Sequence, residues 1–263
     1  MPEYLAQLVA HYSPFQWALI VVVLSLGSVI QGAVGFASGL FSIPLLVVFN
    51  IPLEQAAAIN FLLTAMQNFF GAWKLRAELR RDEVILPMVL RWVGIPLGVF
   101  AMHRTSSLPP TVVKQVIGLL LLVTVIFMWL WRVKHRERIP LPATVVTFLT
   151  SGFLLGFAAI GGAPMVLYVN TLTWSAAKCR AFLFLLSATG VPPMAVLLAW
   201  TFGAQLLPAV AAAAVAMPFC WMGVLLGMRL GRLLDKRLFR TLTYGLLTVI
   251  AVSSVLSPWL SGR

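Results

Sequence analysis

Side chains and backbone groups suited to binding an anion gather at two glycine-rich breaks in the apolar stretches of this chain. The first break covers residues 32–39, with the sequence GAVGFASG, and Pro44 follows it. The second covers residues 152–164 and ends in the run GGAP. Gly32 and Gly152, which open the two breaks, are as far apart in the sequence as Pro44 and Pro164. The two halves of the chain therefore have matching breaks. Interrupted hydrophobic segments at such places point to the binding site of a transporter.

A break of this kind creates helix N-termini inside an apolar stretch, where they can bind an oxyanion. The first turn of a helix carries unpaired amide hydrogens and the positive end of the helix dipole. Glycine admits an anion without a clashing side chain, and we expect Pro44 and Pro164 in the first turn of a restarting helix, where no amide is needed. The alternative is that these glycines serve helix packing alone. The expected backbone contacts are Gly35, Gly39, Gly161, Gly162 and Ala163.

Polar side chains near the breaks add hydrogen-bonding groups to the predicted site. Asn60, Thr64 and Gln67 fall at helical spacing on one face of the segment that follows the first break. Polar groups in lipid face a cavity or a neighbouring helix, so each of these side chains contacts either a substrate or another helix. The side chains expected at the substrate site are Gln31, Ser38, Ser42, Asn60, Gln67, Tyr168 and Asn170.

Arg91 is the only charged residue well inside an apolar segment. It can act as the counter-charge of an anion in the transport pathway, or its long side chain can reach the cytoplasmic interface. We include Arg91 among the predicted substrate-binding residues. The seven acidic residues, in contrast, all fall in predicted loops or at segment ends. Because proton-coupled carriers usually bury a carboxylate, we expect transport to follow the membrane potential, with proton symport as the alternative.

Other chemistries lack the residues that they need. Cys179 and Cys220 lie in or beside apolar segments and predict packing rather than a disulfide, and no cysteine and histidine cluster has metal-ligand spacing. No histidine pairs with a serine or cysteine at a recognisable spacing, and no phosphate-binding loop of the Gly-x-x-x-x-Gly-Lys-Ser/Thr type occurs. The sequence therefore predicts no enzyme activity, no metal and no cofactor.

The composition places the chain in a lipid bilayer. Of its 263 residues, 61% are hydrophobic and 10% are charged, and the mean hydropathy is +0.98. A soluble domain carries about 25% charged residues. The net charge of +12 does not indicate a nucleic-acid partner, because the basic residues fall in short loops, as the positive-inside rule requires. The expected partners are a small anionic substrate and the bilayer, and the sequence sets no oligomeric state.

Apolar segments account for most of the chain and predict an all-α, polytopic membrane protein. Segments 36–50 and 163–173 are too short to span a bilayer, which takes about 20 residues, so we expect half-helices folded back at the breaks. The protein then has about eight to ten membrane segments. They are expected at residues 15–34, 36–50, 56–73, 84–102, 111–131, 141–160, 163–173, 181–200, 206–228 and 239–258.

The segments divide into two transmembrane repeats, at residues 1–132 and 139–263. Each half has an odd number of segments, so the second half enters the membrane from the opposite side, which makes an inverted repeat. Four clusters of Lys and Arg, at 74–81, 132–138, 178–180 and 229–240, then share one face. This face is expected to be cytoplasmic, with the N- and C-termini outside.

The doubled glycine motifs resemble those of the sulfite exporter TauE/SafE family, a group of small membrane anion carriers. The resemblance rests on residues 32–44, on the GGAP run with Tyr168 behind it, on Cys179-Arg180-Ala181, and on the Gly-x-x-x-Gly pairs at 94–98 and 223–227. It implies export of sulfite or organosulfonates such as sulfoacetate across the bacterial inner membrane. Ala37 and Ser38 stand where the family carries denser glycine. The alternatives are a carrier of other small organic or inorganic anions and a non-transporting membrane subunit.

Overall fold

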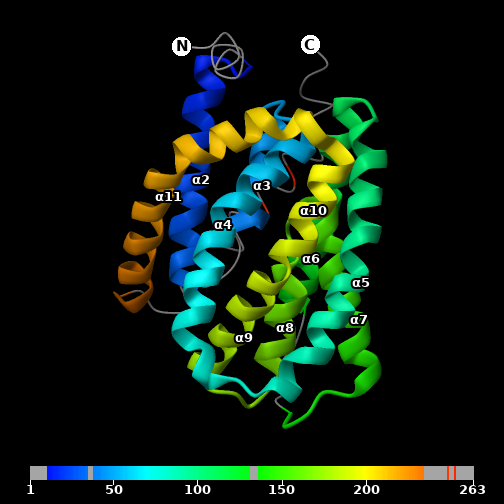
Figure 1. Cartoon of the computed structure of the whole chain (residues 1–263), viewed down its shortest axis with the longest axis vertical. Coiled ribbons are helices and arrows are strands. Elements are labelled where there is room, and N and C mark those ends of the chain that lie inside the picture. Colours follow the sequence, from blue (N-terminus) through cyan, green and yellow to red (C-terminus); the bar gives the residue numbers. More distant parts are fainter. Residues whose placement is uncertain (1–10, 35–37, 131–135, 234–247, 249–251, 253–263) are drawn as a thin grey trace.

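The computed structural model describes residues 11–34, 38–130 and 136–233, together with residues 248 and 252. The regular elements of these residues are all helices, with one isolated β-bridge between Arg136 and Leu172. Most of the helices lie along the long axis of one elongated bundle (Figure 1). The predicted all-α fold is confirmed.

The described residues form both long and short helices. They are α2 (Pro14–Val34), α3 (Ser38–Val48), α4 (Leu53–Leu75), α5 (Arg81–Ser106), α6 (Pro110–Leu130), α7 (Leu141–Ala158), α8 (Gly162–Thr171), α9 (Ala176–Thr189), α10 (Val191–Phe202) and α11 (Leu207–Leu233), with the 3-10 turns η1 (Arg76–Glu78) and η2 (Gly203–Leu206). Among the described residues, five stretches are long and apolar enough to cross a membrane. The chain is therefore a multi-pass membrane protein. The segment expected at 239–258 lies outside the described residues.

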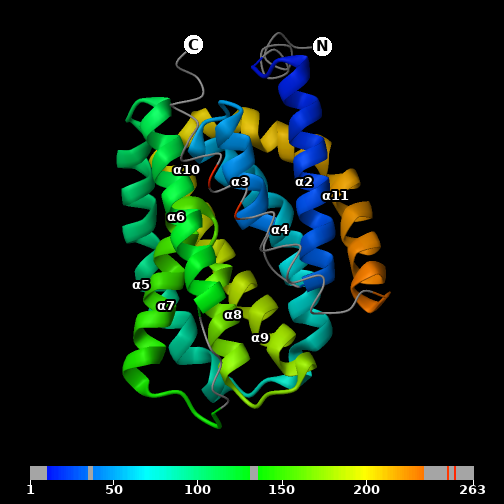
Figure 2. The same ribbon diagram turned by 180° about the vertical axis from the view of Figure 1, so that it is seen from behind.

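The helices α3 and α8 are half-helices, as the segment lengths predicted. They have 11 and 10 residues, or about 15 Å each, which is half of the ~30 Å hydrocarbon core. Asn50, just after α3, accepts a hydrogen bond from Lys114 in α6 at 2.8 Å, whereas Thr171 at the end of α8 accepts one from the backbone of Arg136 at 2.8 Å. The two half-helices therefore run from the centre towards opposite ends of the bundle (Figures 1 and 2).

The helices depart from the predicted boundaries at Pro44 and at Gly190. Pro164 lies in the first turn of α8, as expected, but Pro44 lies in the interior of α3, so its predicted place in a first turn is wrong. The reason is that α3 already begins at Ser38. The segment expected at 181–200 is also divided at Gly190 into α9 and α10, because the two prolines after Val191 lack the amides that would continue the α9 hydrogen bonds.

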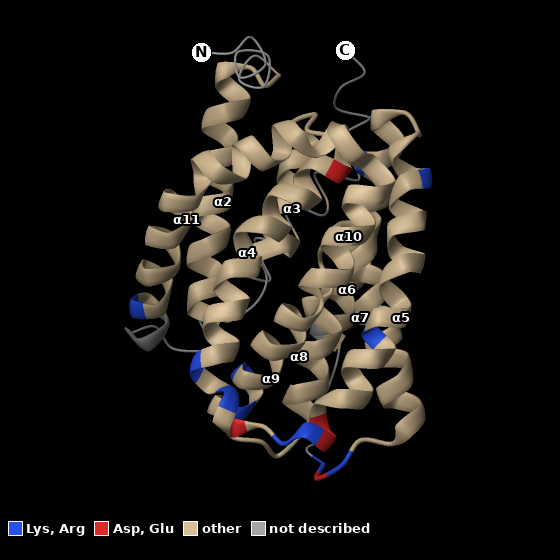
Figure 3. Ribbon diagram, viewed as in Figure 1, with Lys and Arg blue, Asp and Glu red and all other residues tan. Residues whose placement is uncertain are grey.

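Basic residues gather at one end of the bundle, called here the basic end (Figure 3). The described members are Lys74, Arg76, Arg80, Arg81, Arg136, Arg138, Lys178 and Arg180, at helix ends and in the short links between helices. Arg229 lies near the end of α11, and the predicted cluster members at 132, 134, 236, 237 and 240 lie outside the described residues. The helix α2 begins at the opposite end, where Tyr12 donates a 2.7 Å hydrogen bond to Gln55 of α4.

Small residues join α5 to α7 along a close seam. A methyl group added at Gly94 would collide with the carbonyl oxygen of Leu149, and one at Gly98 with that of Phe153. In return, one at Gly152 would collide with the carbonyl of Arg91. The prediction that these Gly-x-x-x-Gly pairs serve helix packing is therefore confirmed for this seam.

The helices α2 and α11 form a second seam of the same kind. Added methyl groups at Gly32, Gly223 and Gly227 would meet the carbonyls of Val224, Ser25 and Val29. When the two seams are compared, Gly32 of α2 occupies the position equivalent to Gly156 of α7. The predicted equivalence of Gly32 and Gly152 is therefore wrong by one helical turn. The starts of α3 and α8 follow the same corrected interval. The inverted repeat stays a prediction, and the shared register supports it.

Candidate functional site

A cavity lies where the two breaks meet, between the starts of the half-helices. Gly39 at the start of α3 lies against Ala159 and Ile160, which follow α7. The cavity has a volume of about 70 Å³, several times the ~10–15 Å³ that one water needs on the same measure. Its polar and glycine lining consists of Gln31, Ser38, Gly39, Asn60, Thr64, Asn68, Arg91, Gly161, Gly162 and Ser187.

Arg91 brings a positive charge to the cavity wall. Its side chain projects from α5 into the bundle and is 2% exposed, so it does not reach the interface. One terminal nitrogen donates a hydrogen bond to the carbonyl of Leu186 in α9, whereas Nε has no partner. Gly190 makes room for this guanidinium, since an added methyl group would lie 3.2 Å from Nη1. Burying a cation with an unpaired donor costs free energy unless a ligand supplies the missing hydrogen bond and negative charge.

Asn60 of α4 directs its amide nitrogen towards the first break. Ser38 Oγ donates a 2.9 Å hydrogen bond to Asn60 Oδ1, and both side chains are 2% exposed. The remaining amide nitrogen lies near Gly39, at 3.2 Å from the place of an added methyl group. Because the amide oxygen is held by Ser38, the group that Asn60 offers to the cavity is its pair of N–H donors.

The start of α8 adds backbone donors from the second break. The chain leaves α7 through Ala159, which has a left-handed backbone (φ 52°), and the amides of Ala159 and Ile160 bond back to carbonyls of α7. Gly161 then precedes α8 without any side-chain cap. Its carbonyl accepts a 2.6 Å hydrogen bond from Ser151 Oγ. The uncapped first turn of α8 thus presents amide hydrogens and the positive end of the helix dipole at the cavity.

A comparison with protein-family models matches residues 19–254 to the sulfite exporter TauE/SafE model. The match covers both breaks and both seams. The chain belongs to the sulfite exporter TauE/SafE family. Members of this family are membrane transporters. Comparisons with curated proteins and with solved structures gave no significant match.

Within this TauE/SafE chain, a polar path leads from the cavity towards the basic end. Asn60, Thr64 and Asn68 follow one another along one face of α4 and all line the cavity. Asn60 is buried, whereas Thr64 and Asn68 are half-buried. In the opposite direction along α4, Ala56 and Ala57 are fully buried among apolar side chains. The α4 wall of the cavity therefore carries a row of polar side chains directed towards the basic end.

The structure brings seven of the predicted residues to this cavity: Gln31, Ser38, Gly39, Asn60, Arg91, Gly161 and Gly162. The sequence did not identify Ser187 of α9 as a site residue. On α4 it predicted Gln67 at the site, whereas Asn68 lines the cavity. Ser187 is the first polar residue of an apolar run and lies just before Gly190, and this was the available signal. Contact of these residues with a substrate stays a prediction.

Two predicted side chains hold helices together instead of lining the cavity. Ser42 is fully buried, and its hydroxyl donates a 3.4 Å hydrogen bond to the carbonyl of Val23, which ties α3 to α2. Gln67 donates a 3.5 Å hydrogen bond to Ser28 Oγ, which ties α4 to α2. The physical reason is that each side chain points towards α2 rather than towards the breaks.

The remaining predicted residues lie on other faces of α8 or outside the described part. Ala163 and Tyr168 line an apolar groove of about 710 Å³ between α6, α7 and α8, on the side of α8 away from the cavity. The ring of Tyr168 also packs on Phe148 and Phe182. Asn170 is exposed near the end of α8. Gly35 lies outside the described residues.

Proposed function

We propose that this protein is a secondary carrier for a small sulfur-containing anion, such as sulfite or an organosulfonate. The observation that carries the proposal is Arg91, a buried cation with an unpartnered Nε in the wall of a cavity between two broken helices. The uncapped start of α8 and the Asn60 amide nitrogen supply further donors to the same anion. Such donors are the groups that an oxyanion requires.

We further infer that transport runs from the basic end outwards. The polar side chains of the α4 cavity wall are directed towards the basic end, which the positive-inside rule assigns to the cytoplasm. An anion that leaves a negative interior moves downhill by about 2.3 kcal/mol per charge for each 100 mV. Export across a bacterial inner membrane therefore needs no further energy source. The family match supports this direction through its description as a sulfite exporter.

The test is thermal stability of the detergent-purified protein with sulfite, thiosulfate, sulfate, sulfoacetate or malate. We expect sulfite or a sulfonate to raise the melting temperature, and Arg91→Gln to abolish the rise. The matched control is Arg104→Gln, because Arg104 lies in the same helix but is exposed, with its guanidinium 5.1 Å from the Phe100 ring. A rise with malate alone would indicate an organic-acid carrier. The absence of any rise, together with no flux in liposomes, would indicate a non-transporting subunit.

A further inference from the structure

Three hydrogen-bond acceptors at or beside the cavity are already bonded to groups of the protein itself. Ser38 Oγ donates to the amide oxygen of Asn60, and Ser151 Oγ donates to the carbonyl oxygen of Gly161. The carbonyl of Leu186 accepts from the guanidinium of Arg91 and also from the backbone amide of Gly190. Each of these oxygens would otherwise be open to a bound donor.

The donors around the same cavity, in contrast, remain open. Arg91 Nε has no partner, the amide nitrogen of Asn60 is turned away from Ser38, and the first turn of α8 has no side-chain cap. No carboxylate occurs among the described residues that line the cavity. The described acidic residues lie at the starts of α4 and α5, in η1 and in the link before α7, namely Glu54, Glu78, Asp82, Glu83 and Glu137.

We propose that the cavity selects anions without a cationic group and rejects zwitterionic aminosulfonates. This inference rests on the proposed function and names the substrate class more narrowly. A sulfonate or a fully ionised sulfite group accepts hydrogen bonds only, and it matches the open donors. An ammonium group on the same molecule would lie beside the positive charge of Arg91, with no carboxylate in the described lining to balance it. Rejection by repulsion and unpaired donors is a common source of specificity.

A matched pair of ligands tests the proposal on the purified wild-type protein. Isethionate and taurine share a two-carbon sulfonate and differ only in carrying a hydroxyl or an ammonium group at the other end. We expect isethionate to compete with sulfite in liposome flux and to raise the melting temperature, and taurine to act at least tenfold more weakly. Equal action of both ligands would overturn the charge selection but leave the sulfur-anion carrier standing. Failure of sulfite and both sulfonates would refute the proposed function itself.

A variant of Ser151 tests whether the occupied acceptors contribute to the selectivity separately from Arg91. Ser151→Ala removes the hydroxyl that covers the Gly161 carbonyl, so this oxygen becomes available to an ammonium group. We expect the preference for isethionate over taurine to narrow several-fold. The control is Thr147→Ala on the same helix, because Thr147 is half-buried away from the cavity and its hydroxyl bonds to the carbonyl of Ala143. An unchanged preference in folded Ser151→Ala protein would overturn the part assigned to the acceptors.

Discussion

Arg91 combines two properties that rarely occur together in a membrane protein. It is buried in the middle of a helix, and one of its donors has no partner. The bond to the Leu186 carbonyl fixes the guanidinium against α9 without neutralising it. The protein therefore keeps a net positive charge at the meeting point of the two breaks, and a bound anion would remove the cost of this charge.

A carboxylate at Asn60 should remove the binding of anions. Asn60→Asp is nearly isosteric, but it puts a negative charge beside the cavity and within the field of Arg91. We expect sulfite-dependent stabilisation to fall at least tenfold, measured by thermal shift over a range of sulfite concentrations. Asn170→Asp is the control, because Asn170 is exposed and outside the cavity. Equal losses in the two variants would contradict the placement of the site.

Single residues were predictable from the sequence where the apolar background makes them stand out. Arg91 and Asn60 are isolated in apolar segments, and the glycine breaks mark the backbone around them. Tyr168 was not predictable in the same way, because closeness to a break along the chain does not say which face of a helix a residue occupies. In α8, Gly162 and Met165 face the cavity, whereas Tyr168 lies on the opposite side.

The two seams and the two half-helices have different structural roles. The seams bring the backbones of α5 and α7, and of α2 and α11, into contact, so these pairs are held rigidly. The half-helices α3 and α8 begin near the centre, and the first turn of α8 has no side-chain cap. Segment lengths and glycine spacing predicted both features. The interior position of Pro44 was not predictable, because residues 32–39 offer several places for a helix to restart and only packing selects Ser38.

A methyl group in the α5 and α7 seam should destabilise the whole protein. Gly98→Ala would press on the Phe153 carbonyl and the Gly156 backbone, which cannot turn aside. We expect a loss of about 1–3 kcal/mol in the free energy of unfolding, measured by denaturation in detergent. Gly71→Ala is the control, since the atoms nearest to its methyl group would be those of the Phe184 ring, which is a side chain and not backbone. A larger loss for Gly71→Ala than for Gly98→Ala would contradict this assignment.

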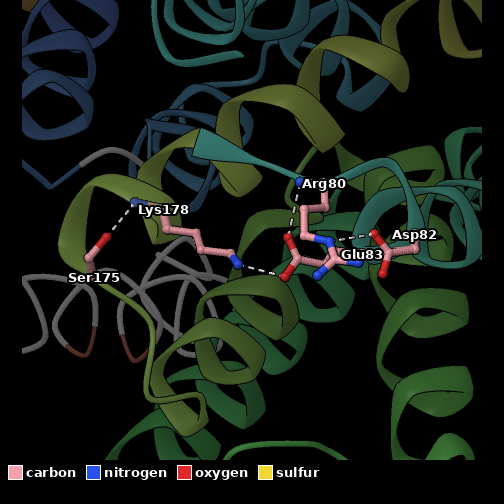
Figure 4. A network of polar contacts seen from close by, with 5 residues as sticks. All are labelled: Arg80, Asp82, Glu83, Ser175 and Lys178. Carbon is pink, nitrogen blue, oxygen red and sulfur yellow. Dashed lines mark hydrogen bonds and ion pairs between the residues drawn. The ribbon is translucent and has the colours of Figure 1, made fainter. Parts of the chain in front are cut away.

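An ion pair at the basic end joins the start of α5 to the start of α9 (Figure 4). Lys178 Nζ lies 2.5 Å from Glu83 Oε1, and the two side chains are 23% and 21% exposed. Glu83 Oε2 also accepts a 3.1 Å hydrogen bond from the Arg80 amide, and Ser175 caps α9 by accepting one from the Lys178 amide at 3.2 Å. The pair thus connects two helices that both line the cavity.

A double-mutant cycle should detect this connection. Glu83→Gln keeps a side chain that can cap α5, and Lys178→Met keeps most of the apolar stem. We expect a coupling of about 1 kcal/mol between the two substitutions at low salt, decreasing as salt is added. Unfolding of the two single variants and the double variant provides the measurement. Strict additivity at low salt would show that the pair contributes nothing to stability.

The arrangement of charge on the whole molecule leads to a prediction about orientation. Ser107 follows α5 at the end away from the basic end, and Glu137 lies at the basic end. In a background with Cys179→Ala and Cys220→Ala, we expect Ser107→Cys to react with an impermeant maleimide on intact cells. Glu137→Cys should react only after the cytoplasmic face is opened. The reverse pattern would contradict the cytoplasmic assignment of the basic end.

The two glycine seams also bear on how the chain is held together as a molecule. The helix α2 of the first half packs closely against α11 of the second half, and α7 of the second half packs closely against α5 of the first. The two halves are therefore in close contact along two separate seams. We therefore expect the two halves to assemble when the chain is split at the linker between them and both polypeptides are made together. Either polypeptide alone would leave the glycine rows of its seams without their partner helices.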